Sequence, residues 1–259
     1  MHFGKSADCC FFPMSTVQSP KDFRFRPCDV GQMLTRNFHR KWPDQFKRAK
    51  CTMWMSEQPA VHGQAEHNYI ILRDPVAHTL SNYFHCKESK DHRRYSYRMP
   101  TLDQWLDAWV DALTNETKAT ENGHFYCYDP RDFETKFVGF NASAPLAESK
   151  QMLKQKFDVI GDQSQMDKTV CMIHTRYAGW VPDECDCTDR RRRSLGSVDH
   201  GVTHHGDTFN LTNHHSQKID KLRPDDAKLY KLGQEIFAEQ VAEVERTFQV
   251  KLCDTYQKQ

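Results

Sequence analysis

The sequence lacks several features that would place it directly in a functional class. Its formal net charge is only +1 over 259 residues, so it has no overall basic field of the kind that nucleic-acid-binding proteins use. Its longest apolar runs are far shorter than the roughly 18 residues of a transmembrane helix, and no signal peptide is recognisable. It also has no internal repeat and no linker-like segment, which predicts a single domain over residues 1–259 with a sizeable core.

Two missing motifs argue against common ligand-binding classes. None of the ten cysteines belongs to a C-x-x-C pair, and the spacing of Cys185 and Cys187 is wrong for a standard zinc ribbon. The chain contains no G-x-x-x-x-G-K-(S/T) motif and no clear magnesium-binding Asp motif. A P-loop kinase of small molecules is therefore disfavoured.

The cysteines and sequons that are present indicate a compartment. Ten cysteines are many for a cytosolic protein, and N-x-(S/T) sequons begin at Asn115, Asn141 and Asn210. Together they favour an oxidising, secretory lumen. We therefore expect several cysteines to form disulfides, with Cys185 or Cys187 among them.

The most informative stretch is residues 68–87. The apolar run 69–72 predicts a buried strand. Asp74 is a suitable N-cap and Pro75 a suitable first-turn residue for a helix that follows at once. Apolar residues then recur at helical spacing: Val76, Leu80, Tyr83 and Phe84.

Arg73 and Ser81 give this strand–helix unit a possible chemistry. Arg73 ends the strand, and Ser81 follows about two turns into the helix. A guanidinium offers two parallel donors and a hydroxyl adds a third, which is a plausible anion site. The alternative is an ordinary buried strand–helix unit with Arg73 paired to an Asp.

The Leu-Arg-Asp-Pro sequence, followed by Ser81 and Tyr83, resembles a segment of sulfotransferases that use 3′-phosphoadenosine 5′-phosphosulfate (PAPS). It is most similar to the Golgi carbohydrate sulfotransferases of the heparan sulfate 2-O and 6-O type. In that family the segment binds the 3′-phosphate, and the resemblance implies this role for Arg73 and Ser81. His78 stands where the family usually has Arg.

Residues 1–9 resemble the family's phosphate loop, H-(I/V)-P-K-(T/S)-(G/A)-G-(T/S). Four residues match it in order: His2, Lys5, Ser6 and Ala7. The departures from it include Gly4, Asp8 and Cys9. The resemblance implies that Lys5 binds the oxygen between phosphate and sulfate and that Ser6 contacts the phosphate. The strand that should precede the loop is absent before Met1, so we expect an N-terminally truncated chain and a poor catalyst.

In the family, the interval that corresponds to residues 11–66 supplies the general base. Three residues qualify by type: His39, Glu57 and His62. We take His39 and His62 as the catalytic candidates, although the local pattern does not single one out.

The later chain alternates helix and strand patterns. Residues 100–115 predict an amphipathic helix capped by Thr101, with a core-facing stripe: Leu102, Trp105, Leu106, Trp109, Val110 and Leu113. Residues 146–156 predict a helix, 157–161 a strand, and 166–174 a helix with apolar positions Met166, Val170 and Ile173. Pro224 starts the last long helix, within 222–250, whose apolar stripe is Leu229, Leu232, Ile236, Phe237, Val241, Val244 and Phe248.

Parts of this region also resemble the sulfotransferases. Residues 132–136 stand where the family has an N-x-Q-T-R segment that lines the active cleft: Asp132, Glu134, Thr135 and Lys136. The block around residue 160, a helix followed by F-D-x-(V/I)-G and a second helix, is also similar to one in the family. The family's N-x-x-D-x-x-L-Y ending is resembled by Asp225, Asp226, Leu229 and Tyr230.

Three interpretations of residues 185–215 stay open. The run 190–193 could be a solvated basic loop or a processing site. By resemblance it could close over PAPS, with Arg193, Ser194 and Gly196 near the 3′-phosphate or adenine. A metal site would draw on four residues without regular ligand spacing: Cys185, Cys187, His204 and His205.

The resemblance implies an α/β fold, a P-loop-like, mostly parallel sheet flanked by helices whose first strand is missing. It implies transfer of a sulfuryl group from PAPS to a carbohydrate hydroxyl, without a metal. It also implies a location in the Golgi lumen, anchored as a type II membrane protein in the full-length form. The alternative is a catalytically inactive homologue that still binds PAPS or a glycan.

Overall fold

The structure is a computed structural model of the 259-residue chain, and it divides into two compact units. It describes residues 27–29, 53–55, 68–88, 99–115, 129–182, 185–188 and 210–253. The first unit comprises Met1–Gln64 with Gly196–His200. Its described elements are β1 (Pro27–Asp29) and β2 (Met53–Met55), which pair in parallel.

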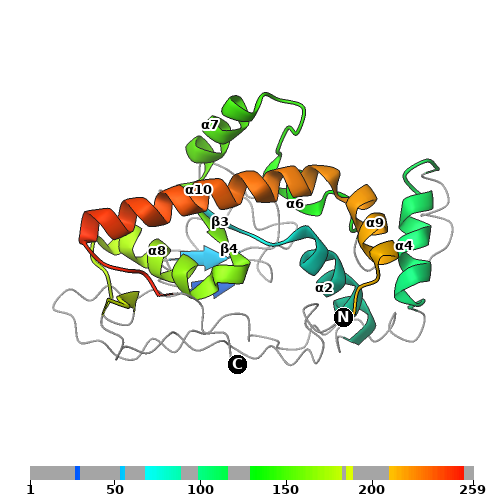
Figure 1. Cartoon of the computed structure of the whole chain (residues 1–259), viewed down its shortest axis with the longest axis horizontal. Coiled ribbons are helices and arrows are strands. Elements are labelled where there is room, and N and C mark those ends of the chain that lie inside the picture. Colours follow the sequence, from blue (N-terminus) through cyan, green and yellow to red (C-terminus); the bar gives the residue numbers. More distant parts are fainter. Residues whose placement is uncertain are drawn as a thin grey trace. The chain divides into compact units, whose positions relative to one another are not determined.

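The second unit, Ala65–Leu195 with Gly201–Gln259, is built around a parallel pair of strands. β3 (Tyr69–Leu72) pairs with β4 (Val159–Asp162), in a register that places Leu72 opposite Asp162. Seven α-helices flank this pair within the described residues (Figure 1): α2 (Pro75–Glu88), α4 (Leu102–Asp111), α6 (Phe133–Val138), α7 (Leu146–Lys156), α8 (Met166–Ala178), α9 (Asn213–Leu222) and α10 (Pro224–Phe248). The unit is therefore mixed α/β and mostly helical, with a small parallel sheet.

The strand–turn–helix unit predicted around Arg73 is confirmed. β3 ends at Leu72, and α2 begins at Pro75. The Asp74 carboxylate accepts a hydrogen bond from the Ala77 amide at 2.9 Å, as an N-cap does.

The predicted amphipathic helix also forms, but it is shorter than predicted. Thr101 and Gln104 make a capping box at the start of α4, where the hydroxyl accepts from the Gln104 amide. The buried residues of the stripe are Leu102, Trp105, Leu106 and Trp109. The prediction that Leu113 faces the core is wrong, because α4 ends at Asp111 and Leu113 is 47% exposed.

The sequence pattern placed the inner face of α8 wrongly. Ile173 is buried as predicted, but Met166 and Val170 are only half-buried. A more central position on the buried face belongs to Thr169, whose hydroxyl accepts from the Asp162 amide and donates to the Asp162 carbonyl, both at 3.0 Å. The polar Thr169 sits there because it ties α8 to the end of β4.

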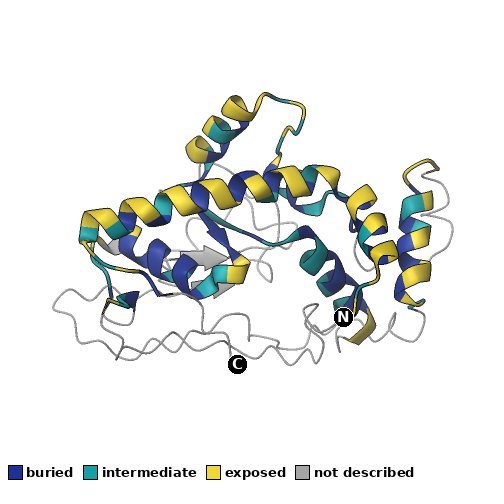
Figure 2. Ribbon diagram, viewed as in Figure 1, coloured by how far each residue is buried: buried dark blue, intermediate teal, exposed yellow. Residues whose placement is uncertain are grey.

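α10 packs along the sheet and has one buried and one exposed face (Figure 2). The helix starts at Pro224 as predicted, and six of the seven predicted stripe residues are buried, whereas Phe248 is half-buried. Gly233 lies so close to β3 that a Cβ there would come within 2.3 Å of the Leu72 Cδ1. The helix and the strands share an apolar cluster: Leu72, Val138, Leu153, Phe157, Ile160, Leu229, Leu232 and Ile236.

Two disulfides hold the chain beyond α8. Cys171 pairs with Cys185, and Cys187 pairs with Cys253. Both cysteines that we expected to be oxidised are therefore in disulfides. Around them lies a second apolar cluster, which includes Val159, Phe237 and Val244.

Within the described part of the chain, no helix is both long and apolar enough to cross a membrane.

Candidate functional site

The candidate site lies at the carboxyl end of the two parallel strands. Because β3 and β4 run in the same direction, the residues that follow them emerge at one edge. Arg73 and Asp74 follow β3, and Asp162 is the last residue of β4. In open α/β sheets this edge is where ligands bind.

Arg73 and Ser81 belong to the same strand–helix unit at this edge. The Arg73 amide donates to Oε1 of Glu134 at 3.0 Å, which fixes the backbone at the turn. Ser81 is half-buried on α2, seven residues beyond Asp74 and three beyond His78, so the three lie on one face of the helix. Within the described residues the Ser81 hydroxyl makes no hydrogen bond. The polar face of α2 therefore continues from the turn to Ser81.

Glu134 joins α2 and α6 at this edge. Its Oε1 lies 3.1 Å from the His78 Nδ1, and its side chain is only 10% exposed. The other oxygen, Oε2, is buried and has no hydrogen-bond partner in the described part of the structure. The rings of His78 and Phe133 pack in a T-shaped arrangement, with their centroids 5.2 Å apart. The site thus holds a carboxylate and an imidazole next to the Arg73 backbone.

A fully buried ion pair lies beneath these groups. Arg223 is 2.6 Å from Asp226, and the two side chains are 1% and 0% exposed. The Arg223 guanidinium also donates to the Pro75 carbonyl at 2.9 Å and to the Thr79 hydroxyl at 3.1 Å. The pair therefore fixes the start of α10 against the start of α2.

α6 and α10 cap each other through two aspartates. The Asp226 carboxylate accepts from the amides of Glu134 at 3.3 Å and Thr135 at 2.7 Å. Oδ1 of Asp132 accepts from the amides of Asp225 at 2.9 Å and Asp226 at 3.1 Å. Burial raises the pKa of Asp132, and the neighbouring carboxylates of Asp225 and Asp226 add to that rise. The four orphan amides are thereby satisfied in a buried place.

The segment 132–136, which resembles a cleft-lining motif, is only partly at this edge. Glu134 faces Arg73 and His78. Lys136 instead is 59% exposed and lies 3.6 Å from Asp129. Lys136 therefore does not add positive charge to the site.

The end of β4 carries a second polar group. Oδ1 of Asp162 accepts from the Tyr230 hydroxyl at 3.2 Å and from the Ser164 amide at 2.9 Å. Burial, reinforced by the negative charges of Asp162 and Asp74, raises the pKa of Tyr230 to about 12. The tyrosine is therefore a neutral donor at ordinary pH, and it links α10 to the end of β4.

Sequence reasoning missed Arg223 and the structural role of Asp226. The only sequence signal that could have pointed to Arg223 is its position directly before Pro224, the first residue of the last helix. Conversely, several predicted site residues lie outside the described residues: Lys5, Ser6, His39, Glu57, His62, Arg193 and Ser194. Of the predicted site, the structure brings Arg73 and Ser81 together on one unit.

The metal interpretation is wrong for its two cysteines, because Cys185 and Cys187 are consumed in disulfides and offer no thiolate. His204 and His205 lie outside the described residues. In the part of the chain that the structure describes, no group of three or more His, Cys, Asp or Glu residues is placed to hold a metal ion.

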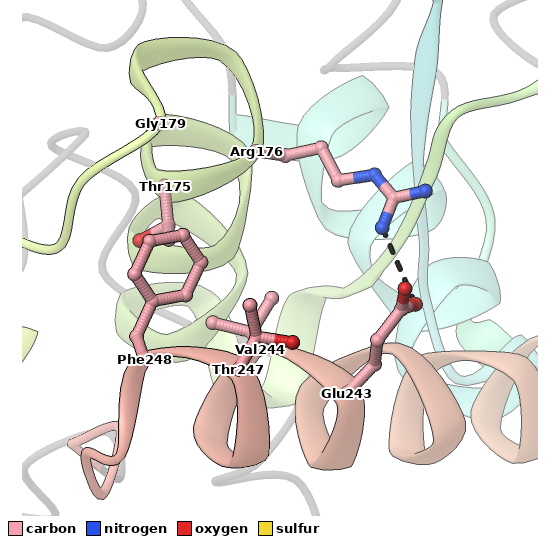
Figure 3. Close-up of a pocket in the computed structure, with 7 residues that line it drawn as sticks. All are labelled: Thr175, Arg176, Gly179, Glu243, Val244, Thr247 and Phe248. Atoms are coloured by element: carbon pink, nitrogen blue, oxygen red, sulfur yellow. Dashed lines mark hydrogen bonds and ion pairs between the residues drawn. The ribbon is translucent and has the colours of Figure 1, made fainter.

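A cavity of about 280 Å³ lies elsewhere, between the C-terminal ends of α8 and α10 (Figure 3). Arg176 on its wall is already paired with Glu243 at 3.3 Å. The remaining lining is Thr175, Gly179, Val244, Thr247 and Phe248. α8 starts at the carboxyl end of β4 and runs back, so this cavity is at the opposite end of the strands from Arg73.

Comparisons with protein-family models, with curated proteins and with solved structures found no match for this chain.

Proposed function

We propose that this chain is a PAPS-dependent sulfotransferase with a P-loop-like, mostly parallel sheet, and that its acceptor is a carbohydrate hydroxyl. The proposal rests most on one observation. Arg73 directly follows a parallel strand and lies just before a capped helix, and Ser81 lies on the half-exposed polar face of that helix. This is the arrangement expected of a 3′-phosphate clamp.

The clamp has the donors that a phosphate needs. A guanidinium presents parallel N–H donors that match two phosphate oxygens, and a charge-assisted contact of this kind contributes about 1.5–3 kcal/mol. The Ser81 hydroxyl, which makes no hydrogen bond within the described residues, would add a neutral hydrogen bond of about 0.5–1.5 kcal/mol. The Arg73 backbone is already fixed by Glu134, so little conformational entropy is lost there on binding.

The remaining roles come from the resemblance. The acceptor oxygen would attack sulfur, the bond from sulfur to the bridging oxygen would break, and adenosine 3′,5′-bisphosphate would leave. Lys5 and Ser6 would hold the departing phosphate, and His39 or His62 would take the acceptor's proton. Arg193 and Ser194 would close over the nucleotide. A secretory, Golgi-lumen location with a type II membrane anchor fits the disulfides.

Two features favour, as the second candidate, a catalytically inactive homologue that binds a glycan or holds PAPS only weakly. The Glu134 carboxylate is bonded to the Arg73 amide, so a negative charge already lies beside the proposed phosphate site. Two like charges about 4 Å apart repel by roughly 4 kcal/mol at an effective dielectric constant near 20. His78 also stands where the family has an arginine, which removes a permanent positive charge. Both features weaken anion binding.

A thermal-shift series tests nucleotide recognition. We expect PAPS and adenosine 3′,5′-bisphosphate to raise Tm, since a ligand at 100 times its Kd stabilises by about 2.7 kcal/mol. Adenosine 5′-phosphosulfate, which lacks the 3′-phosphate, and ATP should give much smaller shifts. Equal shifts with all four nucleotides, or none, would contradict the proposal.

Sulfate transfer then separates the two candidates. Labelled PAPS is incubated with the chain and a mixture of glycans, and radioactivity in the glycan fraction is counted. Transfer above a no-enzyme control supports the enzyme. Selective PAPS stabilisation with no transfer identifies the inactive homologue.

A further inference from the structure

The turn between α6 and α7 contains the sequon Asn141-Ala-Ser143. Asn141 and Ser143 are both exposed. Oδ1 of Asn141 accepts the Ser143 amide at 3.0 Å, and the Asn141 carbonyl accepts the Ala144 amide at 3.1 Å. We propose that Asn141 is a site of N-linked glycosylation and that it is the preferred site of the two sequons lying wholly within the described residues.

The reactive atoms of this sequon are available. Among the described residues, the Asn141 Nδ2 and the Ser143 hydroxyl make no hydrogen bond. The nitrogen can therefore form a bond to the anomeric carbon of a polyisoprenyl-diphosphate-linked oligosaccharide. The bond from that carbon to the diphosphate breaks, the polyisoprenyl diphosphate leaves, and the amide nitrogen releases one proton.

The sequon at Asn210 is less favourable in the folded protein. Its hydroxyl residue, Thr212, is the N-cap of α9, where it accepts from the His215 amide and contacts the His215 ring nitrogen at 3.1 Å. Its middle residue, Leu211, packs against the apolar cluster of α2, α4 and α9. The sequon at Asn210 is thus held by α9 and by an apolar cluster, whereas within the described residues the hydrogen bonds of residues 141–144 stay inside their own turn. The third sequon begins at Asn115, and its Thr117 lies outside the described residues.

The surface around Asn141 can accommodate a sugar. Two large hydrophobic side chains are exposed in the described part of the chain, Leu146 at 66% and Leu113 at 47%, and each lies within five residues of a sequon asparagine. A hollow of about 180 Å³ adjoins Asn141 and is lined by Gly139, Asn141, Ala144, Glu148, Ser149 and Met152. A sugar on Asn141 would lie against this hollow and cover part of its apolar lining. The hollow and the sequon belong to α7 and the turn before it, and the inference does not depend on the proposed function.

The compartment required for this modification agrees with the covalent structure. The two disulfides, Cys171–Cys185 and Cys187–Cys253, form and persist in an oxidising lumen. N-linked glycosylation occurs in secreted and lumenal proteins. One passage through that compartment accounts for both features.

The test uses the full chain with a cleavable secretory leader, expressed in a mammalian host. Peptide-N-glycosidase F should increase its mobility on a denaturing gel, and mass spectrometry should find Asn141 converted to Asp in most copies. Ser143→Ala should remove one glycan-sized step in mobility, while Ser143→Thr, which keeps the sequon, should retain it. Ser143→Ala leaves the turn intact, because the bond to Asn141 comes from the backbone amide of residue 143.

Asn210→Gln serves as the matched control, and it should leave the Asn141 peptide modified to the same extent. Secretion of each variant is compared first, so that a lost step cannot be mistaken for misfolded protein retained in the cell. An unmodified Asn141 in secreted protein, or an Asn210 peptide modified to a greater extent than the Asn141 peptide, would overturn the proposal.

Discussion

The two ends of the β3·β4 pair are held together by different forces. At the carboxyl end, α2, α6 and α10 meet through buried charges and backbone caps, with Arg223, Asp226 and Glu134 at the centre. At the amino end, apolar side chains surround Val159, and two disulfides fix the following chain. The carboxyl end therefore offers hydrogen-bond donors that a ligand could use. The amino end contributes to stability and offers no such donors among the residues named here.

This difference predicts how each end responds to change. Buried charges depend on every partner being present, because an unpaired buried charge costs much more than the intact pair gains. Where apolar contacts and disulfides hold the structure, each substitution removes only the stability of the contact or bond it deletes. The carboxyl end should therefore be the more sensitive of the two to single substitutions.

The largest effect should come from Asp226→Ala. It leaves Arg223 buried without its ion-pair partner and uncaps α6, and we expect a loss of about 3–5 kcal/mol in the free energy of unfolding. Denaturant unfolding followed by circular dichroism measures the loss. Asp225→Ala is the control, because that side chain is 38% exposed and pairs at the surface with Lys228. It should cost about 0–1 kcal/mol. Equal losses in the two variants would contradict the buried-pair account.

At the amino end, the double substitution Cys187→Ser with Cys253→Ser opens a link across a sequence separation of 66 residues. Without this link the unfolded chain regains conformational entropy, so the free energy of unfolding should fall by about 4 kcal/mol. The Cys171–Cys185 link spans 14 residues, so its removal should cost about 3 kcal/mol. Differential scanning calorimetry of the two double variants gives the order, and a larger loss for the shorter link would refute this ranking.

The substitution Gly161→Ala tests the contact between β4 and α8. A Cβ at residue 161 would come within 2.2 Å of Cγ2 of Thr169, which is itself bonded to Asp162. We expect a loss of about 1–3 kcal/mol from overpacking. The second substitution Thr169→Ser removes the obstructing methyl but keeps the hydroxyl. If Thr169→Ser fails to restore part of the stability lost in the Gly161→Ala chain, the steric explanation is wrong.

The smallest effect concerns pH. The pKa of Tyr230 is raised from 10.0 to about 12, so the folded state holds this proton more tightly than the unfolded state. Stability that is present below pH 10 should therefore decline as the pH rises from about 10 to about 12. A phenolate absorbance titration should show one late-titrating tyrosine that is absent in Tyr230→Phe. If Tyr230 titrates near pH 10, its burial beside Asp162 is contradicted.

Local signals in the sequence predicted the local structure well. Asp74, Thr101 and Pro224 act within a few residues of themselves, so their capping and first-turn roles could be inferred from spacing alone. The amphipathic stripe of α10 could be inferred for the same reason.

The network at the carboxyl end could not be predicted in this way. The Arg223 guanidinium donates to the Pro75 carbonyl, 148 residues earlier in the chain. No local sequence pattern can predict a contact over that separation. The inner face of α8 was misassigned because a buried Thr169 looks like a surface residue in a hydrophobic pattern. Polar groups buried by long-range hydrogen bonds are hidden from periodicity, and the candidate site is made of such groups.

The central proposal, that Arg73 anchors a 3′-phosphate, is tested most directly by isothermal titration calorimetry with adenosine 3′,5′-bisphosphate. Arg73→Ala should weaken binding roughly ten- to a hundredfold, the equivalent of about 1.5–3 kcal/mol. Arg73→Lys should fall between the two, because it keeps the charge and loses the bidentate fork. Arg176→Ala is the control, since this arginine lies at the opposite end of the strands and pairs with Glu243, and it should bind like the unmodified chain. Unchanged affinity in a folded Arg73→Ala chain would contradict the proposed site.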